Sequence, residues 1–362
     1  MTNLRNMLLR RPAAGKALVV GALLALAIPG IAYANTVGVT VKTPGATAGP
    51  GSAFSEITTN AACSSGLISG GGINQAIGTG TSSNGNKING TSPSPDGSTE
   101  YTGSTGVVGT DVTYWLGIGG SGGAVNASFS STPYAMCFSS SLINHTQVVM
   151  NKVAGPTTGS TVGLVTATCP ANTRLLGGGA RITPAVVGSL KPIAGFPTFN
   201  DSAHAFGQKA ASDGETNPDS WSAVGWNGGG GDSGNTTYAC AICSGNNINI
   251  SGTTVKVRFS EVSGPTAGTS GATVTVGCGQ NDGKLVSGGA AISGGGVTST
   301  NFTGPGSQGD HLNGSYPSDS GGNPVADGAT TASYWSAFTH TGAPSSPNTY
   351  SDVWALCAND GV

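Results

Sequence analysis

Two cysteines three positions apart, Cys240 and Cys243, form the motif of this sequence that most directly points to chemistry. Cysteines at this spacing exchange thiols and disulfides when the first lies at a helix N-terminus, where its thiolate is stabilised. Here the motif follows Thr237 and Tyr238, in a run typical of a strand end. We therefore predict no redox activity and expect Cys240 to be an unpaired cysteine or one that links two chains.

Two other segments, 231–235 and 318–322, resemble the Gly-Asp-Ser-Gly-Gly sequence around the serine of chymotrypsin-like proteases. A serine nucleophile needs a histidine base and a carboxylate to orient it. The nearest histidine before Ser233 is His204, only 29 residues away and too close for two β-barrels. We interpret both segments as Gly-rich turns. Because the remaining histidines, His145, His311 and His340, are scattered, we predict a protein that is not an enzyme and has no metal or cofactor.

The cysteines belong to a threefold internal repeat. In each copy a Gly-Pro pair starts 14 residues before a cysteine and a glycine cluster follows that cysteine. A tryptophan then stands 22 residues before the cysteine of an Ala-x-Cys segment. The tryptophans are Trp115, Trp221 and Trp335. Each is predicted to be a core residue next to a disulfide, although an exposed ring could stack on a sugar. Trp226 and Trp354 have no counterpart in the other copies, which makes them better candidates for exposure.

Six of the seven cysteines hold equivalent positions in the three copies. Six cysteines allow 15 pairings, and the repeat favours one bridge in each copy. The predicted bridges are Cys63 with Cys137, Cys169 with Cys243, and Cys278 with Cys357. Loops of this length stabilise a fold by about 4 kcal/mol when they are closed.

The N-terminus has the pattern of a cleaved export signal. Basic residues precede an apolar run over 17–28, and Ala32-Tyr33-Ala34 is a suitable cleavage site. The run is shorter than the roughly 20 residues of a membrane span, so we expect a secreted, extracellular protein, with the periplasm or cell surface as alternatives. Without the signal, 10 basic residues face 16 acidic ones, a net charge of −6 that argues against nucleic acid as a partner.

Composition favours an all-β fold. The chain has 62 glycines and only 8% charged residues, and glycine is costly in helices. Residues 255–260 alternate apolar with polar, as in a strand with one buried face. We predict a signal peptide at 1–34 and three tandem repeats at 35–143, 144–250 and 251–362, each a disulfide-pinned, β-sandwich-like unit of about 106 residues. One pseudo-threefold, β-prism-like body is the alternative.

Segments between the glycine cluster and the tryptophan differ among the copies, so we predict long loops there. Two of them, 88–94 and 312–318, are similar to each other. Their amides and hydroxyls suit hydrogen bonds to a glycan, although Asn-Gly and Ser-Pro also make ordinary turns. The candidate ligand-binding residues are Asn89, Thr91, Asn313, Ser315 and Tyr316.

The order of cysteine, "LLGGGA", tryptophan and Ala-x-Cys resembles Gly-rich repeat modules of exported bacterial proteins of unassigned function. The resemblance covers residues 37–357 and is strongest over 169–180. It implies export but no particular activity. The sequence therefore favours a non-catalytic exported or cell-surface protein that adheres to a glycan or another surface component. The alternatives are a self-assembling subunit of an extracellular layer or filament and, less favoured, a secreted hydrolase.

Overall fold

A computed structural model describes residues 36–76, 85–123, 129–184, 190–200, 209–229, 234–246, 250–268, 270–295, 297, 302–343 and 345–360. The signal segment predicted at 1–34 lies outside the described residues. All described regular structure is β-strand, which confirms the all-β prediction. No helix in this part of the chain is long and apolar enough to cross a membrane.

Each repeat folds as a sandwich of two layers with three main strands in each layer. In the first repeat one layer is β1 (Gly38–Lys42), β8 (Ser130–Ser139) and β4 (Leu67–Ala76). It packs on a second layer formed by β3 (Glu56–Ala62), β7 (Tyr114–Ser121) and β5 (Asn86–Ser94). The β-sandwich-like repeat expected from the sequence is therefore present.

The second and third repeats have the same plan. In the second, β9 (Thr146–Ala154), β15 (Thr236–Ser244) and β11 (Leu175–Thr183) face β10 (Thr161–Thr168), β14 (Ser220–Asn227) and β12 (Leu190–Phe199). In the third, β16 (Thr254–Ser263), β21 (Tyr350–Asn359) and β18 (Lys284–Ser293) face β17 (Gly271–Gly277), β20 (Tyr334–Thr341) and β19 (Asp310–Ser318).

The layers of different repeats join into three shared sheets. The first sheet has the order β1-β8-β4-β19-β20-β17, the second β10-β14-β12-β18-β21-β16, and the third β3-β7-β5-β11-β15-β9-β6. The short strands β2 (Thr47–Ala48), β6 (Gly106–Thr110) and β13 (Lys209–Ala210) pair with β8, β9 and β12. Each repeat thus gives one layer to each of two sheets.

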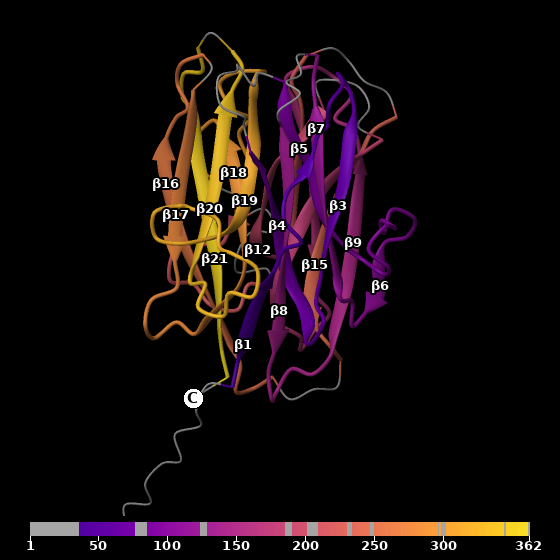
Figure 1. The fold of residues 1–362 in the computed structure, drawn as a ribbon, viewed down its shortest axis with the longest axis vertical. Helices are drawn as coiled ribbons and strands as arrows, with labels where there is room; N and C mark the ends of the chain where they lie inside the picture. Colours follow the sequence, from indigo (N-terminus) through magenta and orange to yellow (C-terminus); the bar gives the residue numbers. More distant parts are fainter. Residues whose placement is uncertain are drawn as a thin grey trace, which may run out of the picture. The chain divides into compact units, whose positions relative to one another are not determined.

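This sharing closes the three tandem repeats into a ring. The junction pairs are β5 with β11, β12 with β18, and β19 with β4, so that the last link returns from the third repeat to the first. Figure 1 shows β4, β12 and β19 near the middle of the body. All described residues lie in one compact unit of the chain. The sandwich repeats and the pseudo-threefold body that we considered as alternatives are therefore two aspects of one structure.

The second residue of each glycine cluster (70–72, 177–179 and 287–289) explains the repeated tryptophan. A Cβ at this glycine would lie within 2.6 Å of the indole ring in all three repeats, so the ring packs directly on the backbone. The pairs are Gly71 with Trp115, Gly178 with Trp221, and Gly288 with Trp335. These indoles are at most 1% exposed, which agrees with the prediction that they belong to the core.

The third residue of each cluster, a glycine in all three repeats, allows neighbouring repeats to approach. A Cβ there would lie 2.0–2.4 Å from a backbone carbonyl oxygen of the strand across the junction. The pairs are Gly72 with Ser315, Gly179 with Thr91, and Gly289 with Gly195. Any larger residue would push the shared sheets apart at their centre.

The variable segments that we expected to be recognition loops cover sheet edges instead. The first repeat supplies β6, which pairs with β9 of the second. The second supplies 214–217, where Val257 N donates to Glu215 O at 2.8 Å on β16. The third supplies 326–329, where Val41 N donates to Ala329 O at 2.8 Å on β1. Each segment thus clamps the first strand of the next repeat around the ring.

Candidate functional site

The residues predicted to bind a ligand lie in buried strands. Asn89 and Thr91 are in β5, while Asn313, Ser315 and Tyr316 are in β19, both at the centre of shared sheets. Both asparagines are fully buried and Tyr316 is 5% exposed. The prediction that 88–94 and 312–318 are exposed loops is wrong, because these segments form the junctions between repeats.

Internal contacts occupy several of these polar groups. Asn89 Nδ2 donates to Glu56 Oε1 at 2.6 Å, and Asn313 Nδ2 donates to Asn86 O at 3.1 Å. The hydroxyl of Tyr316 donates to Gly322 O at 3.1 Å, and Ser315 Oγ accepts from the indole of Trp335 at 2.9 Å.

The Asn-Gly pairs misled the sequence interpretation because a β-bulge uses the same residues as a tight turn. In both strands the pairing register shifts across the asparagine, between Ile88 and Gly90 and between Leu312 and Gly314. Gly90 also has a positive φ of 155°. A bulge inserts one extra residue and bends the strand without ending it.

The sulfur chemistry of the protein is structural. Disulfides join Cys63 to Cys137, Cys169 to Cys243, and Cys278 to Cys357, the three pairs that the repeat favours. Cys240 is free and 2% exposed. Burial raises the pKa of its thiol to about 12, so it is a poor nucleophile at neutral pH. Its position in the core of β15 also argues against a link between chains.

The protease-like segments show no catalytic arrangement where they are described. In 318–322 the carboxylate of Asp319 accepts hydrogen bonds from the backbone of Gly321 and Asn323, as in a Gly-rich turn. Residues 231–233 and His204 lie outside the described residues. His145 Nδ1 lies 2.8 Å from Asp111 Oδ2, but no hydroxyl or thiol in the described ranges bonds to its other ring nitrogen.

Basic residues hold equivalent positions on β5, β12 and β19, just before the register shift of each strand. Lys87, Lys191 and His311 are at most 5% exposed. Lys87 Nζ donates to Leu190 O, and Lys191 Nζ donates to Gln308 O at 2.8 Å, so each amine links its repeat to the next. Burial lowers the pKa of Lys87 to about 7 and that of Lys191 to about 8.

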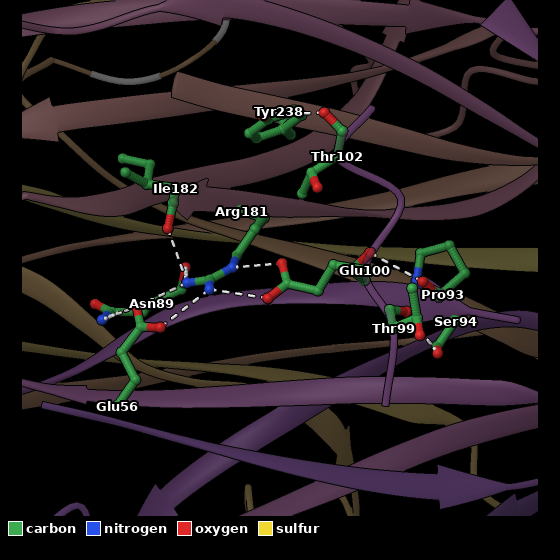
Figure 2. A network of polar contacts seen from close by, with 11 residues as sticks. Glu56, Asn89, Pro93, Ser94, Thr99, Glu100, Thr102, Arg181, Ile182 and Tyr238 are labelled. Atoms are coloured by element: carbon green, nitrogen blue, oxygen red, sulfur yellow. Dashed lines mark hydrogen bonds and ion pairs between the residues drawn. The ribbon is translucent and has the colours of Figure 1, made fainter. Parts of the chain in front are cut away.

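Arg181 ties the first two repeats together at the β5–β11 junction. Its guanidinium binds Glu56 through bonds of 2.8 and 3.0 Å and Glu100 through bonds of 2.7 and 2.9 Å. Figure 2 shows the guanidinium between the two carboxylates. Burial alone would lower the pKa of Arg181, but the hydrogen bonds and negative charges of Glu56 and Glu100 outweigh it and hold the pKa above its usual value. Two carboxylates held by one arginine are poorly placed for acid–base catalysis, so we assign this network to stability.

A groove beside Trp226 is the best candidate for binding. It has a volume of about 680 Å³, compared with about 390 Å³ for the groove beside His145. Its walls are the start of β10 and the segment before β19, with the lining residues 160–162, Trp226 and 304–308. The groove therefore lies between the second and third repeats.

The geometry of the groove depends on contacts across this boundary. Gln308 Nε2 donates to Ser160 Oγ at 2.7 Å, which connects the two walls. The Trp226 ring packs on Gly304, where a Cβ would lie 2.5 Å from the ring. Trp226 is 5% exposed, and its indole N–H has no hydrogen-bond partner among the described residues. Lys191 lies behind the groove and holds the backbone of Gln308.

No lining residue of this groove is charged. Ser160, Thr161, Ser307 and Gln308 supply hydroxyl and amide groups that both donate and accept hydrogen bonds. The volume falls within the range of about 300–1,000 Å³ that is usual for small-ligand sites. Such a lining is chemically suited to an uncharged, polyhydroxylated ligand.

The groove was not predicted from the sequence, although two features of the chain pointed toward its location. Trp226 was noted as having no counterpart in the other repeats. The connection before β19 is also longer than its equivalents, spanning 294–309 against 77–85 and 184–189. Trp354, the other unmatched tryptophan, is fully buried against Phe196 and Phe259.

Comparison with models of known protein families gives no match, and no curated protein sequence matches the chain.

Proposed function

We propose that the protein is a non-catalytic, exported binding protein that holds an uncharged glycan in the groove beside Trp226. The observation that carries this proposal is a lining made only of hydroxyl, amide, glycine, proline, valine and tryptophan groups. Three disulfides support an oxidising environment outside the cytoplasm. Adhesion to a glycan-bearing surface is the role that best fits this lining and compartment.

The role of each wall follows from its chemistry. Gln308 and Ser307 line the groove from the third repeat, and Thr161 lines it from the second. The amide nitrogen of Gln308 donates to Ser160 Oγ, so its amide oxygen is the group that a ligand hydroxyl would meet. A sugar hydroxyl bonded by both walls would also favour the closed boundary between the two repeats. Glycan binding should therefore raise the thermal stability of the protein by mass action.

A glycan array with the oxidised mature protein, followed by calorimetry on the strongest ligand, tests the proposal. Gln308→Ala and Thr161→Ala should each weaken binding about fivefold, because a hydrogen bond of ordinary strength contributes about 1 kcal/mol. Thr303→Ala is the matched control: Thr303 is exposed on the same segment but does not line the groove. Its affinity should equal that of the unmodified protein.

Two results would contradict this assignment. One is the absence of any glycan bound above background. The other is a bound glycan whose affinity is unchanged in both Gln308→Ala and Thr161→Ala, which would place the binding site elsewhere.

A further inference from the structure

Among the described strands, three sheet edges have no covering segment of this chain paired to them. Segments of this chain cover β1, β9 and β16, whereas β3, β10 and β17 are terminal strands. A terminal strand presents backbone N–H and C=O groups that can pair with another strand. Natural proteins usually protect such edges with lysine, proline, bulges or covering segments.

The hydrogen-bonding pattern of β17 shows which groups point outward. Thr341 N donates to Ser270 O at 3.1 Å, and Cys278 N donates to Ser333 O at 2.8 Å. No bulge interrupts the pairing of β17 with β20, so the even-numbered residues between these points face β20. The backbone N–H and C=O groups of Thr273 and Thr275 therefore point outward from the edge of the sheet, on the side opposite β20, and no described residue bonds to them.

The sequence of β17, Gly-Ala-Thr-Val-Thr-Val-Gly, suits pairing with a second copy of itself. It has no charged residue and no proline, and it reads almost the same in both directions. Antiparallel pairing centred on Val274 places Thr273 opposite Thr275 of the other copy. Both have outward backbone groups, as a hydrogen-bonded pair requires, and threonine pairs across strands are favourable.

The other two terminal strands are less suitable. In β10 the carbonyl of Thr166 already accepts a bond of 2.8 Å from Asn151 Nδ2. In β3 the edge carries Glu56, whose carboxylate is held by Arg181, and the exposed Asn60, a poor strand former. Only β17 combines a free backbone with an uncharged, self-complementary sequence.

We propose that two copies of this chain associate through β17, antiparallel and about a twofold axis, so that their first sheets join into one continuous sheet. The partner is a second copy because the strand is complementary to itself and carries no charged residue that would repel its counterpart. The groove beside Trp226 shares no residue with β17. Association and glycan binding can therefore be tested separately.

Sedimentation velocity of the oxidised protein, from nanomolar to high micromolar concentration, tests this association. The unmodified protein should show a monomer–dimer equilibrium. Thr273→Pro removes one outward N–H in each copy and should raise the dissociation constant about 30-fold, since two ordinary hydrogen bonds are lost. Proline is tolerated on an edge where the N–H faces solvent. Thr273→Val keeps the N–H and loses only the hydroxyl of the threonine pair, so it should dimerise much more tightly than Thr273→Pro.

The matched control is a proline on β3, at a residue whose backbone N–H also points outward from the sheet edge. Cys63 N donates to Thr113 O, so the backbone of Thr58 points outward from β3. Thr58→Pro should leave dimerisation unchanged. A monomer at every concentration, or a dimer lost in Thr58→Pro but kept in Thr273→Pro, overturns the proposal.

A charge exchange tests the register without depending on proline. In the proposed pair the two copies of Thr273 are diagonal neighbours on one face, about 7–8 Å apart. Thr273→Lys and Thr273→Glu should each dimerise more weakly alone, and a mixture of the two should restore dimers. Equal association of the separate variants and of the mixture would exclude this register.

Discussion

The axis between the three repeats leaves room for one side chain at the level of the first residue of each cluster. Gly70 and Gly177 hold this position in the first two repeats, and Ser287 holds it in the third. A Cβ on Gly70 would lie 2.1 Å from Ser287 Oγ and 2.7 Å from Ser287 Cβ. Rotation of the hydroxyl relieves only the first contact, so Gly70→Ala must force the backbone apart.

The expected magnitude follows from these distances. Adding one methyl group to a close-packed interior costs about 1–3 kcal/mol, and Gly70→Ala should reduce the free energy of unfolding by this amount. Ser287→Gly alone should cost about 0.5–1 kcal/mol in chain entropy, since the hydroxyl has no hydrogen-bond partner among the described residues. With both changes, the nearest remaining atom is Ser287 Cα at 3.6 Å, an ordinary contact.

The double variant should therefore be more stable than the sum of the single effects by about 1–3 kcal/mol, a coupling expected only for residues in contact. Gly177→Ala is the internal control. Its Cβ would lie 2.3 Å from Ser287 Oγ but also 2.4 Å from the backbone oxygen of Ser69, which Ser287→Gly does not remove. The rescue of Gly177→Ala should be much smaller.

Chemical denaturation with the disulfides intact measures the unmodified protein, the three single variants and the two double variants under one set of conditions. A coupling within about 0.5 kcal/mol of zero for Gly70 and Ser287, or an equal rescue of Gly70→Ala and Gly177→Ala, would refute the argument that one side chain fills the axis.

Three further predictions concern the buried charged groups and the free thiol. Arg181→Met should destabilise the fold by about 3–5 kcal/mol, because it leaves the carboxylates of Glu56 and Glu100 without their partner; denaturation at pH 7 measures this, and Glu56→Gln in the Arg181→Met background should recover part of the loss. Burial lowers the pKa of Lys87 to about 7, from 10.5 in the unfolded chain. Between these pH values the folded state binds fewer protons on this amine than the unfolded state does, so the free energy of unfolding should rise from pH 7 to 10.5. Lys87→Met should flatten this rise, and an unchanged pH profile in that variant would contradict the argument. Cys240 should resist alkylation in the folded protein and react fully in denaturant, as mass spectrometry would show, whereas rapid labelling of the native protein is incompatible with its burial.

The sequence by itself determined the features that recur at fixed spacing. Equivalent landmarks occupy equivalent places in a repeat, so the pairing of Cys169 with Cys243 and the burial of Trp221 follow from their counterparts in the other copies. The alternation of apolar residues over 255–260 likewise marked β16, since a strand with one buried face must alternate. These features depend on residues within one repeat.

Only the tertiary structure decided how the repeats meet and what the segments between them do. Asn89 and Asn313 have the local sequence of turns, yet they are bulges at junctions that exist because β5 and β19 pair with strands of other repeats. The groove beside Trp226 also requires Ser160 and Gln308, which are 148 residues apart, to meet across a boundary. The preference of a short segment for a turn or a strand does not reflect such contacts, because their free energy comes from packing between segments far apart in the chain.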